Sequence, residues 1–251
     1  MLYIKSKEIS IGLNNIDIIR EGDCELFKFN TEEELCCKVE GNGKFCAKKG
    51  AMVAFKGNFT FDKMLLGPNN GGGTMNALLG LAKRKLTGEN VELMTVEGSG
   101  IIYLAKNAYH VSVFELEPGD CLSVESENLL AFPIDLKYDV RFLGSGVLSQ
   151  KGLATTVLTN TSNQIQQVAV MTDGNPLMLE APCVVDPDAV VAWTSGPNGG
   201  GDPRVATNNF SWKTVIGQTS GESYQFQFSQ PNQMVLVQPS ERLSGLKVSI
   251  D

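Results

Sequence analysis

The residues best suited to acid–base or metal chemistry are few in this chain. It has one histidine, His110, and six cysteines, at positions 24, 36, 37, 46, 121 and 183. A Ser-His-Asp or Cys-His scheme would depend on His110 alone, and packing explains its place at the start of a strand-like segment. No C-x-x-C pair occurs, and one histidine cannot complete a zinc set of ordinary spacing. We expect free, buried thiols in a reducing compartment, with a redox or metal role as the alternative.

Glycine-rich runs suggest nucleotide binding, but their surroundings oppose it. Gly71-Gly72-Gly73, Gly98-Ser99-Gly100 and Gly144-Ser145-Gly146 lack the GK[ST] ending of a P-loop, and none forms G-x-G-x-x-G between a strand and a helix. We interpret them as turns or close backbone approaches. The carboxylates of 186–188 and Asp202 lack the spacing of a calcium loop. We therefore predict no catalytic, cofactor-binding or metal residue and no cofactor, although no pattern excludes a Ser-Lys or paired-carboxylate site.

Composition favours a single compact, soluble protein. The chain has 251 residues, of which 42% are hydrophobic, and a net charge of −7, which opposes binding to nucleic acid or anionic membranes. The one tight basic cluster is Lys83-Arg84-Lys85. The opening sequence MLYIKSKEISIGL resembles no signal peptide, and no window approaches the ~20 apolar residues of a membrane helix. We expect a cytoplasmic protein that does not bind nucleic acid.

The elements around these residues are mainly strands. Alternating or β-branched and aromatic runs predict strands at 24–29, 91–96, 101–105, 110–116 and 224–228. Turn signals separate such runs at 41–43, 118–120, 173–176 and 196–199. In YQFQF, Tyr224, Phe226 and Phe228 fall on one face, as in a half-buried strand. Spacings near ten residues indicate an all-β sandwich or barrel rather than β-α-β units.

One segment, 74–86, has the pattern of a short helix. Thr74 is a candidate N-cap, basic residues occupy the last turn, and Gly88 follows as a stop signal. A helix that covers a sheet edge or barrel end is the simpler interpretation. A helix that lies on a membrane surface or binds a partner is the alternative, because leucines combined with Lys and Arg are typical of such helices.

Internal repetition is the most informative feature. Three stretches share a turn-like start, an apolar pair, an alanine and an aromatic residue: 49–55, 126–132 and 187–193, anchored at Ala54, Ala131 and Ala192. Two further echoes occur in the same order, 87–93 with 220–226 and 100–105 with 233–238. We predict one body, 1–251, of tandem repeats near 20–110, 111–180 and 181–251. Such units pack against their copies in the same chain or in a symmetric partner.

Taken in order, these residues resemble the altered-inheritance-of-mitochondria family, also described as a bacterial domain of unknown function. The resemblance spans roughly 35–240 and is carried by Cys37–Gly43, Gly50–Phe55, Lys83–Glu89, Gly98–Ala105, Leu116–Asp120, Leu129–Phe132 and Met234–Gln238. It implies an all-β fold like that of the tryptophan RNA-binding attenuation protein (TRAP). It supplies no activity and no catalytic residues. This chain departs from the family pattern in its cysteine-rich N-terminal part, at 140–146 and in the long loop 196–203.

The fold class expected is all-β: repeated TRAP-like antiparallel β-sandwich units with pseudo-symmetric internal duplication and one short helix. The leading functional hypothesis is a non-catalytic binding or scaffold protein that acts as a homo-oligomer, with a trimer as a candidate state and no identified ligand. Membrane-surface association through 74–86 is one alternative. An uncharacterised enzyme with a carboxylate or cysteine site is the other. TRAP binds RNA, but the acidic balance of this chain argues against transferring that activity, because fold alone does not fix function.

Overall fold

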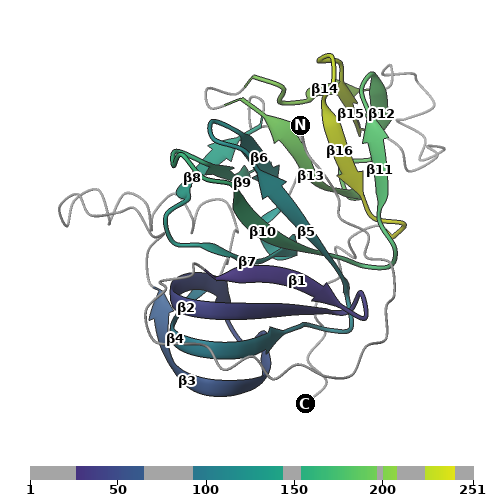
Figure 1. Cartoon of the computed structure of the whole chain (residues 1–251). Helices are drawn as coiled ribbons and strands as arrows, with labels where there is room; N and C mark the ends of the chain where they lie inside the picture. The colour runs from purple at the N-terminus through teal and green to yellow at the C-terminus, as the bar shows by residue number, and fades with distance from the viewer. Residues whose placement is uncertain (1–26, 65–92, 144–153, 197–199, 208–223, 241–251) are drawn as a thin grey trace, which may run out of the picture.

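A computed structural model of the chain describes residues 27–64, 93–143, 154–196, 200–207 and 224–240 (Figure 1). The strands in these ranges are β1 (Lys28–Glu32), β2 (Cys36–Lys48), β3 (Met52–Met64), β4 (Leu93–Leu104), β5 (His110–Leu116), β6 (Cys121–Val124), β7 (Leu129–Pro133), β8 (Lys137–Phe142), β9 (Ala154–Thr159), β10 (Gln166–Thr172), β11 (Leu177–Glu180), β12 (Cys183–Val185), β13 (Val190–Ser195), β14 (Arg204–Thr207), β15 (Tyr224–Phe228) and β16 (Met234–Val237). A short 3-10 turn, η1 (Ser126–Asn128), precedes β7.

The described part is all-β, as the sequence predicts. The described ranges contain no helix long and apolar enough to cross a membrane. The predicted helix 74–86, together with the membrane-surface hypothesis that depends on it, lies outside the described residues. Two predicted strands are matched to the residue, since 110–116 is β5 and 224–228 is β15. In β15, Phe226 and Phe228 are buried whereas Gln227 is exposed, which confirms the predicted alternation for these residues.

The strands form three antiparallel sheets. The seven-stranded sheet has the order β3-β4-β2-β7-β10-β5, with β1 paired to β2. The six-stranded sheet has the order β11-β16-β13-β6-β9-β8, and the three-stranded sheet the order β12-β15-β14. In Figure 1, β3 lies at one end of the molecule and β12 at the other. Each of these two strands is the outermost strand of its sheet.

Strand pairing divides the chain into three units. The first unit is built from three long strands, β2, β3 and β4. In the second unit six shorter strands replace them: β5 and β6 correspond to the two halves of β2, β7 and β8 to those of β3, and β9 and β10 to those of β4. The third unit repeats this with β11 to β16 in the same order. Each unit therefore contributes two three-stranded layers. The third unit begins with β11, so the approximate repeat boundary at 180/181 falls within it.

A row of glycines lets the long strands of the first unit turn from one layer into the other. Gly41, Gly100 and Gly57 lie side by side across β2, β4 and β3, with φ angles of 147°, 127° and 127°. L side chains rarely adopt such angles, and a Cβ on Gly57 would clash with the Ser99 carbonyl oxygen. The expectation of a turn at Gly41-Asn42-Gly43 is therefore wrong. The chain bends there without leaving the strand, because glycine permits both the angle and the close approach.

The same explanation applies to Gly98-Ser99-Gly100, where the sequence left a turn and a close backbone approach both open. The predicted strands 91–96 and 101–105 are parts of one continuous strand from residue 93, β4. A Cβ on Gly98 would clash with the Asn58 carbonyl oxygen of the neighbouring strand. The close backbone approach is the correct interpretation. The turn at 118–120 is confirmed, since Asp120 N donates to Glu117 O at 3.0 Å.

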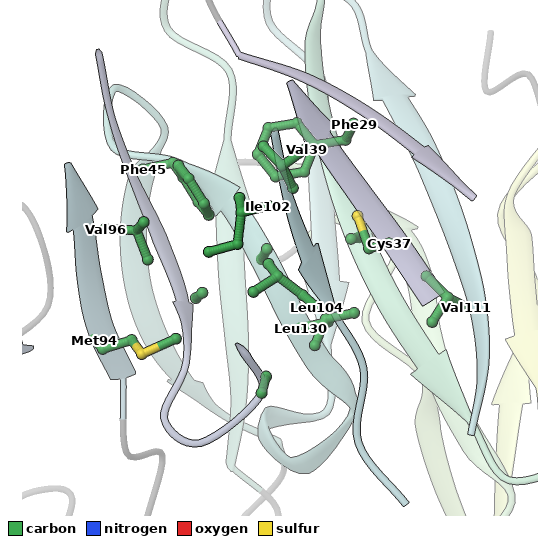
Figure 2. Packing of buried hydrophobic residues seen from close by; sticks show 14 of the residues in the cluster. Phe29, Cys37, Val39, Phe45, Met94, Val96, Ile102, Leu104, Val111 and Leu130 are labelled. Carbon is green, nitrogen blue, oxygen red and sulfur yellow. The ribbon is translucent and has the colours of Figure 1, made fainter. Parts of the chain in front are cut away.

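The core is shared between units. Figure 2 shows Phe29, Val39, Phe45 and Ile102 of the first part of the chain packed together with Leu130 of the second unit. A second buried cluster joins the first two units to the third through residues such as Cys46, Phe132 and Ala192. A third cluster, around Trp193, Phe226 and Phe228, fills the last unit. Burial of side chains between neighbouring units stabilises the stack, because the first two clusters combine residues of more than one unit.

Candidate functional site

His110 begins β5 and lies against the turn between β1 and β2. Its Nδ1 is 3.9 Å from Glu34 Oε2, and that carboxylate is 74% exposed. The same turn is fixed to β5 by a hydrogen bond of 2.7 Å from Val111 N to Glu34 O. His110 Nδ1 is buried and has no hydrogen-bond partner within the described ranges. These contacts place the histidine beside the turn between β1 and β2, and Thr172 of β10 lies opposite it in the sheet.

The five described cysteines are free thiols: Cys36, Cys37, Cys46, Cys121 and Cys183. Burial raises the pKa of Cys46 to about 12 and raises the pKa of Cys37 further still. Burial also raises the pKa of Cys36 and of Cys183, both of which are half-buried. A thiol held in its protonated form is a poor nucleophile and metal ligand. Within the described ranges, no three His, Cys, Asp or Glu residues are grouped to hold a metal.

Lys48 is a half-buried cation that no sequence pattern indicated. It ends β2, and its Nζ donates to Glu127 O at 2.8 Å and to Ser126 O at 3.5 Å. Burial, reinforced by the positive charge of Lys106 and opposed by Glu127, lowers the pKa of Lys48 to about 8. Because the acceptors lie in the turn before β7, the ammonium group joins the first unit to the second. A basic side chain with lowered pKa is also a feature of active sites, but here both these contacts are structural carbonyls.

A shallow apolar depression, with no enclosed space for a water-sized molecule, lies between the layers of the second and third units. Phe114, Leu122, Met178 and Trp193 are among the side chains that line it. Trp193 is 1% exposed, and its Nε1 has no hydrogen-bond partner in the described part of the chain. The depression is therefore not a small-molecule pocket, since such pockets offer about 300 Å³ or more. Its lining offers a ligand little beyond apolar contact.

Exposed apolar side chains form the most distinctive surface. Half of the large exposed hydrophobic residues in the described part, four of eight, lie on β3: Met52, Val53, Phe55 and Phe61. The Phe55 ring contacts Phe59 and Phe61, with centroids 5.7 and 5.9 Å away. Among the described strands, β4 alone pairs with β3. The outer edge of β3 therefore combines an aromatic cluster with backbone groups suited to pairing with another strand.

A second exposed edge lies at the far end of the molecule. β12 pairs with β15 and is the outermost strand of the three-stranded sheet. Val184, at its centre, is 56% exposed, whereas Val185 is 7% exposed. No residue on either edge was predicted as a functional residue, because the apolar alternation of an edge strand is the same as that of a covered one.

Comparison with known proteins gives a family and a fold. The family model described as mitochondrial biogenesis AIM24 matches residues 29–240. A crystal structure of protein SPYM3_0169 from Streptococcus pyogenes is 16% identical in sequence, covers 86% of this chain and 94% of its own, and has a TM-score of 0.56. At this identity the likeness shows the fold alone. A search of curated proteins gave no match.

Proposed function

The chain belongs to the mitochondrial biogenesis AIM24 family, and we propose that it is a non-catalytic binding or scaffold protein that acts as a homo-oligomer. One observation carries this proposal: the apolar outer edge of β3, where Val53 is 63% and Phe55 is 44% exposed. Exposed apolar residues that are contiguous, rather than scattered, mark interaction surfaces in soluble proteins. Long open edge strands are generally avoided unless a partner covers them.

Two of the chemistry-bearing side chains have structural partners, which supports the non-catalytic part of the proposal. Lys48 bonds the turn of the next unit, and Cys121 Sγ lies 3.2 Å from Thr159 Oγ1. The free, buried thiols Cys37 and Cys46 suit a reducing compartment such as the cytoplasm. The net charge of −7 opposes nucleic acid as the partner. A TRAP-like assembly of repeated units, with a trimer as one candidate state, is the form we expect.

Sedimentation velocity at micromolar concentration tests this function directly. The expected result is one species whose mass is a whole-number multiple of 27.1 kDa. Dilution into the nanomolar range provides the control, since a specific assembly dissociates by mass action and returns on concentration. A 27.1 kDa monomer across the whole range would overturn the homo-oligomer.

A further inference from the structure

Each unit contains a tight turn with the same local structure. A tight turn precedes each of the strands β3, β7 and β13, with backbone hydrogen bonds from Ala51 N to Lys48 O, from Asn128 N to Glu125 O and from Ala189 N to Asp186 O. Each strand then carries a bulge, since its pairing register shifts between Met52 and Ala54, between Leu129 and Ala131, and between Val190 and Ala192. Val53, Leu130 and Val191 are therefore equivalent bulge residues, and Phe55, Phe132 and Trp193 are equivalent aromatic residues.

Neighbouring units join through these strands in one fixed register. At the first junction β7 pairs with β2, and Ala131 lies opposite Ala47 and Phe132 opposite Cys46. At the second junction β13 pairs with β6, and the equivalent pairs are Ala192 with Val124 and Trp193 with Ser123. In both cases the bulged strand of one unit, β7 or β13, pairs with a strand of the preceding unit, β2 or β6. That partner strand is the one that leads into the tight turn of its own unit.

If every junction follows this pairing, two of the described strands lack a junction partner, one in the first unit and one in the last. We call each of these strands a half-junction. Among the described strands, β3 is the bulged strand of the first unit and has no earlier unit to pair with. The strand before the last turn, β12, likewise has no later unit in the described ranges. Both are the outermost strands of their sheets.

Equivalent residues differ in exposed fraction according to whether their strand lies at a junction within the chain or at an outer edge. Phe55 is 44% exposed, whereas its equivalents Phe132 and Trp193 are at most 1% exposed. Val184 is 56% exposed, whereas its equivalents Cys46 and Ser123 are fully buried. The apolar side chains on β3 and β12 thus suit a buried junction that one chain does not complete.

We propose that the two half-junctions complete each other between copies: β3 of one copy pairs antiparallel with β12 of the next. The internal register carries over directly, so Ala54 lies opposite Val185 of the next copy, Phe55 opposite Val184 and Lys56 opposite Cys183. This inference rests on the proposed homo-oligomer and names its interface. The three-stranded sheet then continues into the first unit of the neighbouring chain, as the other two sheets already continue from unit to unit.

The contact is head-to-tail, because two different edges meet. Such contacts produce either closed rings or open filaments, according to whether the rotation between copies closes. The three units of each chain would then follow one another around the assembly with every junction alike. A ring leaves neither edge exposed, which removes the apolar surfaces of both β3 and β12.

A cross-link to a native cysteine tests the register. Residues opposite each other in antiparallel strands have Cα atoms about 4.5–5.5 Å apart, which suits a disulfide. In the variant Lys56→Cys, copper phenanthroline and dissolved oxygen should oxidise the new thiol and Cys183 of the next copy to an intermolecular disulfide. The expected result is covalent multimers on non-reducing gels and a linked peptide that joins positions 56 and 183. Lys63→Cys, on the same strand beyond the paired residues, is the matched control and should give no such peptide.

Charge exchange gives a second, independent readout. Phe55→Lys and Val184→Glu should each reduce the fraction of chains in the oligomer at least tenfold at a given protein concentration. Each variant places an unpaired charge in the buried junction. The double variant should restore it, since the introduced ammonium and carboxylate groups then face each other at every junction. Both wild-type residues are exposed in one chain, so circular dichroism should show an unchanged fold.

The two proposals fail in different ways. A wild-type chain that is monomeric at all concentrations overturns the homo-oligomer itself. A stable wild-type oligomer that gives no 56–183 link and tolerates both single variants overturns only the β3–β12 junction, and the assembly then uses another surface.

Discussion

The aromatic rings of Phe55 and Phe61 lie with their centroids 5.9 Å apart, although both residues belong to the strand β3. In an extended strand the Cα atoms of two residues at this separation lie about 20 Å apart. The glycine row at Gly57 accounts for the difference, because it bends the strand so that both rings reach the same cluster. The bend and the exposed aromatic surface are therefore one feature of the first unit.

The first prediction concerns that bend. Gly57→Ala should lower the free energy of unfolding by about 3 kcal/mol or more, since it combines a backbone angle reserved for glycine with a backbone clash. Urea unfolding at fixed protein concentration measures the change. Gly50→Ala is the control, because Gly50 has a φ of +74° with nothing within 4 Å of an added Cβ, so a cost of only about 1–2 kcal/mol is expected. Equal losses in both variants would show that the clash at the bend is not decisive.

The second prediction concerns Lys48 and pH. Burial lowers the pKa of Lys48 to about 8 in the folded chain, from 10.5. Between these values the unfolded chain binds a proton that the folded chain does not, so the contribution of Lys48 makes stability rise with pH through this window. The gain should be on the order of 1–3 kcal/mol. Urea unfolding at about pH 7.5, 9 and 10.5 measures it, and Lys48→Met should remove this part of the rise.

Lys49→Met serves as the control for this experiment, because Lys49 is an exposed lysine beside Lys48. It should keep the wild-type dependence on pH. If Lys48→Met and the wild-type chain show the same slope above pH 8, the ammonium group of Lys48 is not buried as the junction requires.

The third prediction concerns an ion pair between β8 and the loop before β14. Arg141 Nη1 donates to both carboxylate oxygens of Asp202, at 3.0 and 3.1 Å, and Nη2 donates to Gly196 O at 3.2 Å. Both side chains are about 20% exposed, so Asp202→Ala leaves a largely buried guanidinium group without its carboxylate. We expect a loss of about 1–3 kcal/mol in urea unfolding. Glu40→Ala, which removes the more exposed partner of Lys38, should cost at most about 1 kcal/mol, and a reversed order would contradict the assignment.

The fourth prediction concerns thiol reactivity. Cys36 and Cys37 are adjacent, yet only Cys36 is partly exposed, and burial holds the pKa of Cys37 far above its usual range. Iodoacetamide at about pH 8, close to the ordinary thiol pKa, should therefore modify Cys36 at least tenfold faster than Cys37. Peptide mass spectrometry after timed quenching measures both rates. In urea the two rates should converge. Equal rates in the folded chain would mean that this part of β2 opens to solvent.

Much of the local structure follows from the sequence. The alternation of YQFQF locates β15, the run from His110 to Leu116 locates β5, and the glycine at 119 marks a true turn. The echo of 49–55 in 126–132 and 187–193 also marks three stretches with the same turn and bulge. These features depend on residues close together in the chain, so their periodicity and turn chemistry are sufficient to reveal them.

The tertiary structure decided what the sequence by itself left open. The sequence determined that Phe55 and Phe132 hold equivalent places in repeated units, but only the fold leaves one 44% exposed and the other fully buried. The reason is physical: burial depends on the neighbouring strand, and β7 has β2 beside it whereas β3 lies at the edge. Lys48 became partly buried for the same reason, because a turn distant in sequence lies against it. The sequence therefore reveals which residues are equivalent, and the fold determines which of their strands lie at an edge.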